Sequence, residues 1–111
     1  MMDSCIFCKI AAGAIPTPFV YTDDDVVAFR DIQPQAPVHL LVIPRRHIAS
    51  LNEAHDEALL GRLMAAAAKA AAAAGAAQYR VVINTGAQAG QSVLHLHAHV
   101  LGGRAMAWPP G

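Results

Sequence analysis

Three histidines alternate with apolar residues near the end of the chain. The run His95–Leu101 reads His-Leu-His-Ala-His-Val-Leu. A period of two is typical of a half-buried β-strand, in which residues on the same face lie about 6.5–7 Å apart. The pattern therefore predicts a strand with all three imidazoles on one face and Leu96, Ala98 and Val100 on the other.

A loop of small and amide residues precedes this strand. Residues 86–92 read Gly-Ala-Gln-Ala-Gly-Gln-Ser, and such a loop can point backbone N–H groups into a concavity that suits an anion. Neutral imidazoles beside an anion-binding loop indicate phosphate chemistry, with a histidine as nucleophile or as acid and base. The spacing alone leaves a metal site as an alternative, because imidazole is the commonest metal ligand in proteins.

The hydrophobic pattern of the whole chain predicts a single α+β domain over residues 1–111. Apolar runs indicate strands at 19–22, 26–30, 38–43, 79–84 and 94–101, which we expect to form a five-stranded antiparallel sheet. Helical spacing indicates one short helix at 5–12 and one long helix at 56–74. Eleven alanines in Ala65–Ala77 favour the long helix, and Ser50–Glu53 fits a capping box upstream of it.

Charge and targeting signals narrow the class of protein. The chain has 111 residues and no net charge when its histidines are neutral, so we expect neither nucleic acid nor an anionic membrane as a partner. The N-terminus lacks a basic segment followed by an apolar one, and no apolar run reaches the length of a membrane span. We therefore expect a cytoplasmic protein, where a reducing environment disfavours a disulfide between the two cysteines.

The histidine run resembles the signature of the histidine-triad (HIT) family of nucleotide hydrolases and transferases. Residues 31–47 and the tail 101–111, which ends Trp-Pro-Pro-Gly, resemble its nucleotide-binding branch of purine nucleoside phosphoramidases. The resemblance runs from about Cys5 to Gly111 and implies a HIT-like fold. It also implies hydrolysis of AMP–amine phosphoramidates through a covalent nucleotidyl-histidine, without an organic cofactor. The alternatives are a dinucleoside polyphosphate hydrolase, and a nucleotide-binding regulatory protein whose catalysis is incidental.

The resemblance also implies roles for individual residues. His97 would be the nucleophile, since neutral imidazole attacks phosphorus well, and His99, His39 and Ser92 would assist catalysis. His39 is equally compatible with a hydrogen-bonded histidine in the core. The purine would lie against Phe29, Ile32 and Ile15, of which Phe29 and Ile15 also suit ordinary core positions. The implied nucleotide-binding residues are completed by Asp31 at the ribose and, near the phosphate, by Asn84, Gly90, Gln91, Ser92, His97 and His99.

A second constellation begins with Cys5 and Cys8, whose spacing is that of a zinc half-site. Some relatives complete this site with two histidines, at the positions of His47 and His95 here, whereas others lack the cysteines. Four protein ligands would make the zinc structural and not catalytic. The alternatives are a redox-active pair, although no thioredoxin-like βαβ pattern is present, and a cysteine pair that is simply packed in a helix.

Finally, the resemblance implies a homodimer. The long helix and the strand at 79–84 would pack against their copies and join two sheets. The tail from Met106 is too apolar and too stiff for a free terminus, because two prolines fix its path and Trp108 offers a large packing surface. We expect Trp108 to lie near the leaving-group pocket of the neighbouring subunit.

Overall fold

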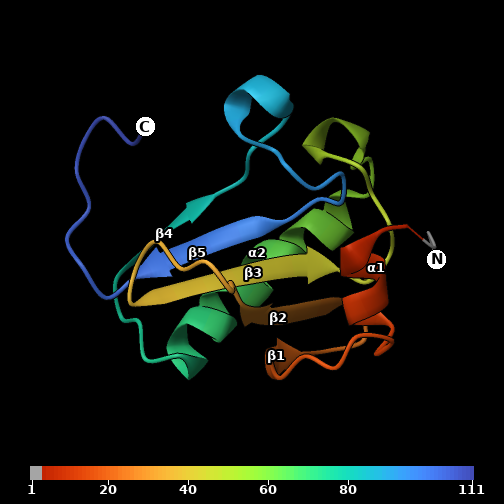
Figure 1. The fold of residues 1–111 in the computed structure, drawn as a ribbon, viewed down its shortest axis with the longest axis horizontal. Coiled ribbons are helices and arrows are strands. Elements are labelled where there is room, and N and C mark those ends of the chain that lie inside the picture. Colours follow the sequence, from red (N-terminus) through yellow and green to blue (C-terminus); the bar gives the residue numbers. More distant parts are fainter. Residues whose placement is uncertain (1–3) are drawn as a thin grey trace.

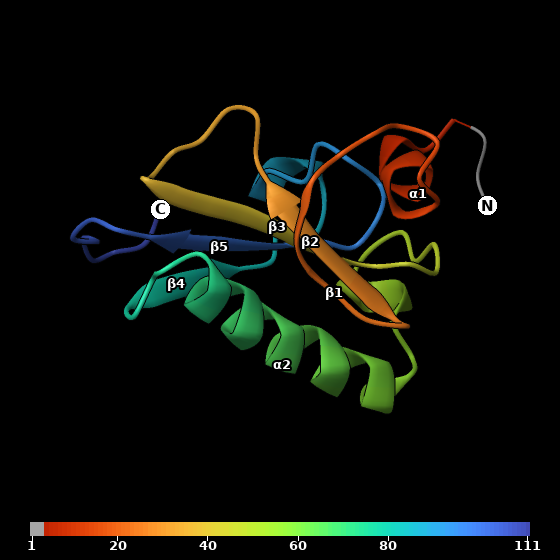
Figure 2. The same cartoon turned by 90° about the horizontal axis from the view of Figure 1, so that it is seen from below.

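A five-stranded antiparallel sheet lies at the centre of the computed structural model, which describes residues 4–111 (Figures 1 and 2). Its strand order is β1-β2-β3-β5-β4, so β1 and β4 are the edge strands. The predicted α+β architecture, with one short helix and one long helix, is confirmed. The strands are β1 (Phe19–Thr22), β2 (Val26–Arg30), β3 (Val38–Pro44), β4 (Tyr79–Val82) and β5 (Ala98–Gly102).

The long helix α2 (Glu57–Ala73) covers one face of the sheet. It begins at Asp56, whose carboxylate accepts a hydrogen bond from the Leu59 N–H at 3.1 Å and so satisfies one of the unpaired donors of the first turn. Its sheet-facing side carries alanines at helical spacing, which lets helix and sheet approach closely. The buried residues of the helix are Leu59, Leu63, Ala66, Ala67, Ala70 and Ala71.

The predicted capping box at Ser50–Glu53 is wrong. Leu51–Glu53 forms the separate 3₁₀ turn η1, and the Ser50 side chain makes no capping hydrogen bond there. The Glu53 N–H already donates to the Ser50 carbonyl inside this turn. The chain then turns again before Asp56, so the aspartate and not the serine lies at the helix start.

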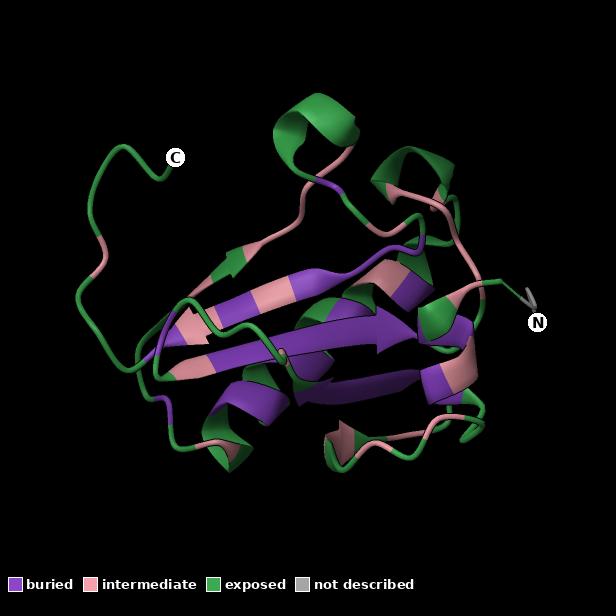
Figure 3. Ribbon diagram, in the orientation of Figure 1, coloured by how far each residue is buried: buried purple, intermediate pink, exposed green. Residues whose placement is uncertain are grey.

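The short helix α1 (Ile6–Ala11) packs on the opposite face of the sheet. Phe7, Ile10 and Ala11 contact the apolar side chains of β2 and β3 on this side. Because both faces of β2 and β3 are covered, these strands are buried over most of their length (Figure 3).

Strand β5 begins at Ala98, four residues later than predicted, and β4 ends at Val82 instead of Asn84. The residues before β5 bend towards the segment that follows β3, where the Leu96 N–H donates to the Ile48 carbonyl at 2.6 Å. The alternation of faces nevertheless continues through the bend. Leu96, like Ala98 and Val100, belongs to the α2-side core.

Within residues 4–111, neither helix has the length and apolar composition that a membrane span requires. This agrees with the absence of long apolar runs in the sequence.

Candidate active site and metal centre

A cavity of 480 Å³ lies between α1 and the α1-facing side of the sheet. It gathers most of the residues predicted to bind a nucleotide, although the sequence places them up to 84 positions apart. Its walls are mainly apolar, with a few polar groups at one end. The predicted residues that line it are Ile15, Phe29, Asp31, Ile32, Ser92, His97 and His99.

Sequence reasoning missed the part of this wall that α1 contributes. Ile6, Phe7 and Ile10 line the cavity, as does Leu41 of β3. Their helical or strand periodicity was recognisable, but it indicates burial without saying whether the buried face meets the core or a ligand. Beside them Ile32 is 95% exposed, although removing an apolar side chain from water is favourable in free energy.

The main chain fixes the tautomer of His97. Its Nδ1 lies 2.7 Å from the carbonyl oxygen of His95. A carbonyl can only accept a hydrogen bond, so Nδ1 carries the proton. In the neutral ring Nε2 then holds the lone pair, which is the form that a nitrogen nucleophile needs.

A second chain of hydrogen bonds fixes His39 and His99. The Gln35 N–H donates to His39 Nδ1 at 3.0 Å, which leaves the proton of neutral His39 on Nε2. That nitrogen lies 2.9 Å from His99 Nδ1, so it donates to it and places the proton of neutral His99 on its own Nε2. His97 thus presents a lone pair while its neighbour His99, whose ring centroid is 5.1 Å away, presents a donor.

The surroundings of His39 and His99 favour the neutral form of both rings. Burial lowers the pKa of His39 below its ordinary value, and the Asp31 carboxylate, 3.4 Å from His39 Nε2, opposes this effect only in part. Burial also lowers the pKa of His99, and the neighbouring rings of His97 and His39 lower it further. Asp31, His39 and His99 are close enough to hold a metal ion, but the inner nitrogens of the two histidines are already used by the hydrogen-bond chain.

In the loop over residues 86–92, the side chain of Gln91 is bonded to main-chain groups of the protein. Gln91 is buried, and its side-chain amide accepts from the Gly86 N–H and donates to the carbonyls of Ala49 and Val93. Its backbone N–H donates to the Gly86 carbonyl. Gln91 therefore holds the loop in shape and has no spare group to offer a phosphate in this conformation.

Within the described residues 4–111, Ser92 is the only member of this loop that lines the cavity. The predicted phosphate contacts Asn84, Gly90 and Gln91 lie outside the lining. Gly90 adopts a φ of 100°, and a Cβ there would come within 3.4 Å of the Asn84 amide nitrogen, so these two residues pack against each other. Their contact with a phosphate stays a prediction.

A second cluster joins α1 to the sheet through Cys5, Cys8, His47 and His95. One potential ligand atom from each residue lies within 4.8 Å of all the others. The Cys8 sulfur is 3.3 Å from His47 Nδ1 and 3.6 Å from His95 Nδ1, and the Cys5 sulfur is 3.4 Å from His95 Nδ1. A tetrahedral zinc with ordinary bond lengths separates its sulfur and nitrogen ligands by about 3.6 Å.

The protonation of His95 also suits a metal. Its Nε2 lies 2.8 Å from the Pro44 carbonyl and must therefore donate to it. The lone pair is then on Nδ1, the nitrogen that faces both sulfurs. The four residues form a site that could hold a metal ion, as the spacing of the cysteines and the family resemblance of the histidines predicted.

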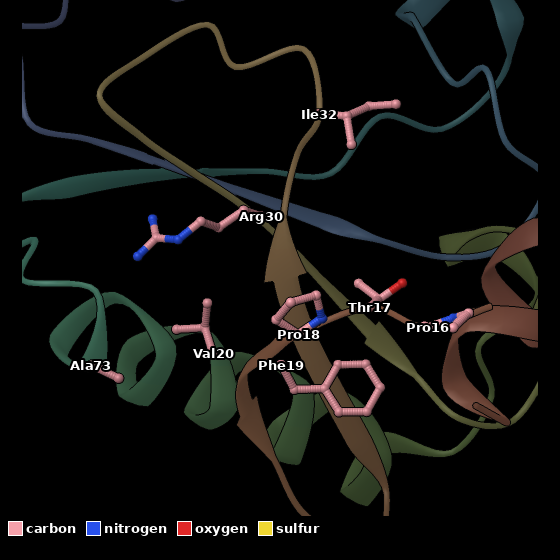
Figure 4. Close-up of a pocket in the computed structure, with 8 residues that line it drawn as sticks. All are labelled: Pro16, Thr17, Pro18, Phe19, Val20, Arg30, Ile32 and Ala73. Carbon is pink, nitrogen blue, oxygen red and sulfur yellow. The ribbon is translucent and has the colours of Figure 1, made fainter. Parts of the chain in front are cut away.

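A second hollow, of 540 Å³, opens beside the main cavity (Figure 4). The segment that leads into β1 forms one wall, the end of β2 forms another, and Ala73 of α2 lies at its edge. Pro16, Thr17, Arg30 and Ile32 line both spaces, so the two hollows are neighbours.

Comparison with other proteins gives a consistent result. The model of the HIT domain matches residues 12–106. An uncharacterised HIT-like protein of Synechococcus elongatus is 54% identical over the whole of both chains, and one of Synechocystis is 50% identical over the same extent.

Solved structures show the same likeness. A HIT family hydrolase of Legionella pneumophila is 50% identical, covers 97% of this chain and 100% of its own, and superposes with a TM-score of 0.91. A HIT family hydrolase of Clostridium thermocellum is 42% identical over 96% of each chain, with a TM-score of 0.92. With its histidine run at the cavity and a domain match over most of its length, the chain belongs to the HIT family.

Proposed function

We propose that the protein hydrolyses purine nucleoside phosphoramidates, in which an amine is bonded to the phosphorus of AMP, through a covalent nucleotidyl-histidine. The observation that carries this proposal is the tautomer of His97. The bond from its Nδ1 to the His95 carbonyl leaves a lone pair on Nε2 of a residue that lines the cavity. The related hydrolases support an enzyme, and the chemistry of the site favours attack on phosphorus.

In the first half of the reaction, His97 Nε2 bonds to phosphorus and the bond from phosphorus to the amine breaks. The electron pair of that bond stays on the amine nitrogen, which takes up a proton. The ring of His97 becomes cationic, and the His95 carbonyl stabilises it through the Nδ1 proton. The adduct is labile, because an imidazolium ring is a good leaving group.

In the second half, water attacks phosphorus and the bond to His97 Nε2 breaks. AMP leaves, and the water releases a proton in place of the one that the amine took up. His99, which presents Nε2–H, donates to a phosphoryl oxygen as charge builds up there. Ser92 lines the same end of the cavity and offers a hydroxyl to the phosphate or to the departing nitrogen.

The rest of the cavity suits the nucleoside. Apolar side chains from α1, β2 and β3 form a slot for a flat purine, and Ile32 would lose its exposure when covered by the ring. Asp31 lies at the rim with its Oδ1 accepting from the Gln33 N–H, which leaves Oδ2 for the ribose hydroxyls and for His39.

Measurement of turnover with a fluorogenic AMP–amine phosphoramidate tests this proposal. We expect multiple turnovers, and an acid quench should trap labelled AMP on the protein. Hydrolysis of dinucleoside polyphosphates at a higher rate would favour the first alternative function. AMP binding without turnover of either substrate would favour a regulatory nucleotide-binding protein.

The same proposal assigns zinc to the cluster of Cys5, Cys8, His47 and His95, and a cytoplasmic homodimer to the assembled protein. Zinc bound there would cross-link α1 to the sheet with no open coordination position, so it would not act on the substrate. The S···N distances of 3.3–3.6 Å support this assignment.

A further inference from the structure

We propose that metal in the cluster of Cys5, Cys8, His47 and His95 controls how well the nucleophile is presented, and that His95 is therefore a positioning residue for His97. This inference rests on the proposed function. It adds that the rate of the proposed reaction depends on a site that does not touch the substrate. Two separate connections run from the cluster to the cavity.

The first connection passes through His95 itself. Its ring is completely buried and is fixed at both nitrogens, by the Pro44 carbonyl on one side and by the two cysteine sulfurs on the other. Its carbonyl oxygen is the group that holds the proton on His97 Nδ1. The side chain of His95 thus belongs to the metal cluster, while its main-chain carbonyl contacts the proposed nucleophile, His97.

The late start of β5 makes this connection important. The ladder between β3 and β5 begins at the pair Val42–Ala98, so the peptide of His95 lies outside it. This peptide, which joins the His95 carbonyl to the Leu96 N–H, is held by the bond from the Leu96 N–H to the Ile48 carbonyl and by the contacts of the His95 ring. If the ring loses its sulfur-side partner, the carbonyl that orients His97 loses part of its restraint.

The second connection passes through α1. Phe7 lies between the two cysteines in sequence, and its ring meets those of His95 and His97 edge to face, at centroid distances of 5.9 and 5.1 Å. A helix of six residues is not stable by itself. It depends on the cluster, on its apolar contacts and on the Arg45 guanidinium, which donates to the Ala11 carbonyl at 3.1 Å. Release of the metal should therefore loosen the cavity wall that α1 provides.

These connections predict two distinct effects of metal loss. When the His95 carbonyl moves, His97 can place its proton on Nε2, and in that tautomer Nε2, the nitrogen proposed to attack phosphorus, has no lone pair. The rate of nucleotidylation should fall about ten- to a hundredfold, as when groups that orient an active-site ligand are altered. AMP affinity should fall less, because most of the cavity wall belongs to the sheet and the loops.

The variant His47→Asn tests this without replacing a residue that lines the cavity. His47 contributes a ring nitrogen to the cluster but does not line the 480 Å³ space. His55→Asn is the matched control, because His55 is an exposed histidine in the loop before α2. For both variants we would measure metal content, the single-turnover rate of AMP transfer to His97, AMP affinity, and the ¹⁵N chemical shifts that report the His97 tautomer.

We expect His47→Asn to lose metal, to transfer AMP slowly and to show a mixed His97 tautomer, with His55→Asn unchanged. Wild-type protein stripped with a chelator should behave like His47→Asn and recover when zinc is added, which covers the case in which the variant folds poorly. Wild type that binds no metal, or a metal-free protein with an unchanged rate and a single tautomer, would overturn the proposal. If wild type shows no turnover, the proposed function fails, and the tautomer of the stripped AMP-bound protein still decides the coupling.

Discussion

Main-chain atoms determine which nitrogen carries the proton in both His97 and His39. The His95 carbonyl accepts from one ring, and the Gln35 N–H donates to the other. The resulting arrangement, a lone pair on His97 beside a donor on His99, follows without any charged partner for His97. The chemistry of the site at neutral pH therefore depends on how the backbone is folded more than on neighbouring side chains.

Replacement of His97 by alanine should abolish phosphoramidate turnover and leave AMP binding within a few-fold of wild type. In the proposed mechanism the ring supplies the bond to phosphorus, whereas the purine and ribose would meet other residues. Turnover and calorimetric AMP titration measure the two effects, and thermal unfolding controls for the fold. Sustained turnover by His97→Ala would show that another group is the nucleophile.

The lowered pKa values of His39 and His99 predict that stability falls as the solution becomes acidic. Between those lowered values and the ordinary value of 6.5, the unfolded chain binds more protons than the folded one. The contribution of these two histidines to the free energy of unfolding should thus be highest above pH 6.5, decrease below it, and level off once the folded rings are also protonated.

His39→Gln isolates one part of this effect. The glutamine amide can accept from the Gln35 N–H and donate to His99 Nδ1, but it does not titrate. Urea unfolding at about pH 5 and about pH 7.5 should show a smaller loss of stability in the variant than in wild type. Equal losses would show that His39 does not contribute to the pH dependence.

At the scale of elements, the loop over residues 86–92 depends on Gln91. Gln91→Ala removes three hydrogen bonds to main-chain groups and leaves the Gly86 N–H and the partly buried carbonyls of Ala49 and Val93 without these partners. We expect the free energy of unfolding to fall by about 2–3 kcal/mol. Gln88→Ala is the matched control, because Gln88 is exposed in the same loop. Equal urea midpoints for the two variants would contradict a structural role for Gln91.

Apolar periodicity predicted the type and order of α1, α2 and the five strands, because it records which face is buried, but it did not indicate the 3₁₀ turns Leu51–Glu53 and Ala87–Ala89. It did not predict where β5 begins. The alternation of His95 and Leu96 continues the strand pattern, but hydrogen bonds to the Pro44 and Ile48 carbonyls replace the ladder there. Periodicity reports which residues are buried. The hydrogen-bond partners of His95 and Leu96 depend instead on the segment Pro44 to Ile48, about fifty residues earlier in the chain.

Gln91 illustrates the same limit for the site. An amide next to Gly90 and Ser92 suits a phosphate as well as it suits a loop carbonyl. The structure shows its bonds to the Ala49 and Val93 carbonyls, which the sequence could not indicate, and its contact with a phosphate stays a prediction. By contrast, Phe29, Asp31 and the histidines were assigned to one site by resemblance, and the structure places Phe29, Asp31, His97 and His99 around one cavity.

At the scale of the molecule, β4 is an exposed edge strand with apolar residues on its surface. Tyr79 and Val81 are exposed there, as is Met64 on α2. An uncovered apolar edge favours association, and a two-fold axis would cover the same patch on both chains. We expect light scattering to give the mass of a dimer at micromolar concentration. A mass near 11.6 kDa would contradict this.

The C-terminal tail is expected to act across that dimer. Trp108 is 83% exposed within its own chain, and the tail is held to β4 by the Arg80 guanidinium, which donates to the Ala107 carbonyl at 2.9 Å. Truncation after Ala105 should change the preference among amine leaving groups more than it changes AMP affinity. Turnover of a series of amines measures this, and an identical preference before and after truncation would exclude a role for the tail.

The contact between Cys5 and His95 joins residues 90 positions apart. During synthesis, α1 can contact β2, β3 and Arg45 well before His95 is made, whereas the contact between Cys5 and His95 has to close a much longer loop, which is costly. The cluster of Cys5, Cys8, His47 and His95 and the part of the cavity wall formed by His97 and His99 are therefore completed last. A nascent chain that stops before His95 should have neither a nucleophile nor a complete wall, so incomplete copies of this protein should not sequester nucleotide.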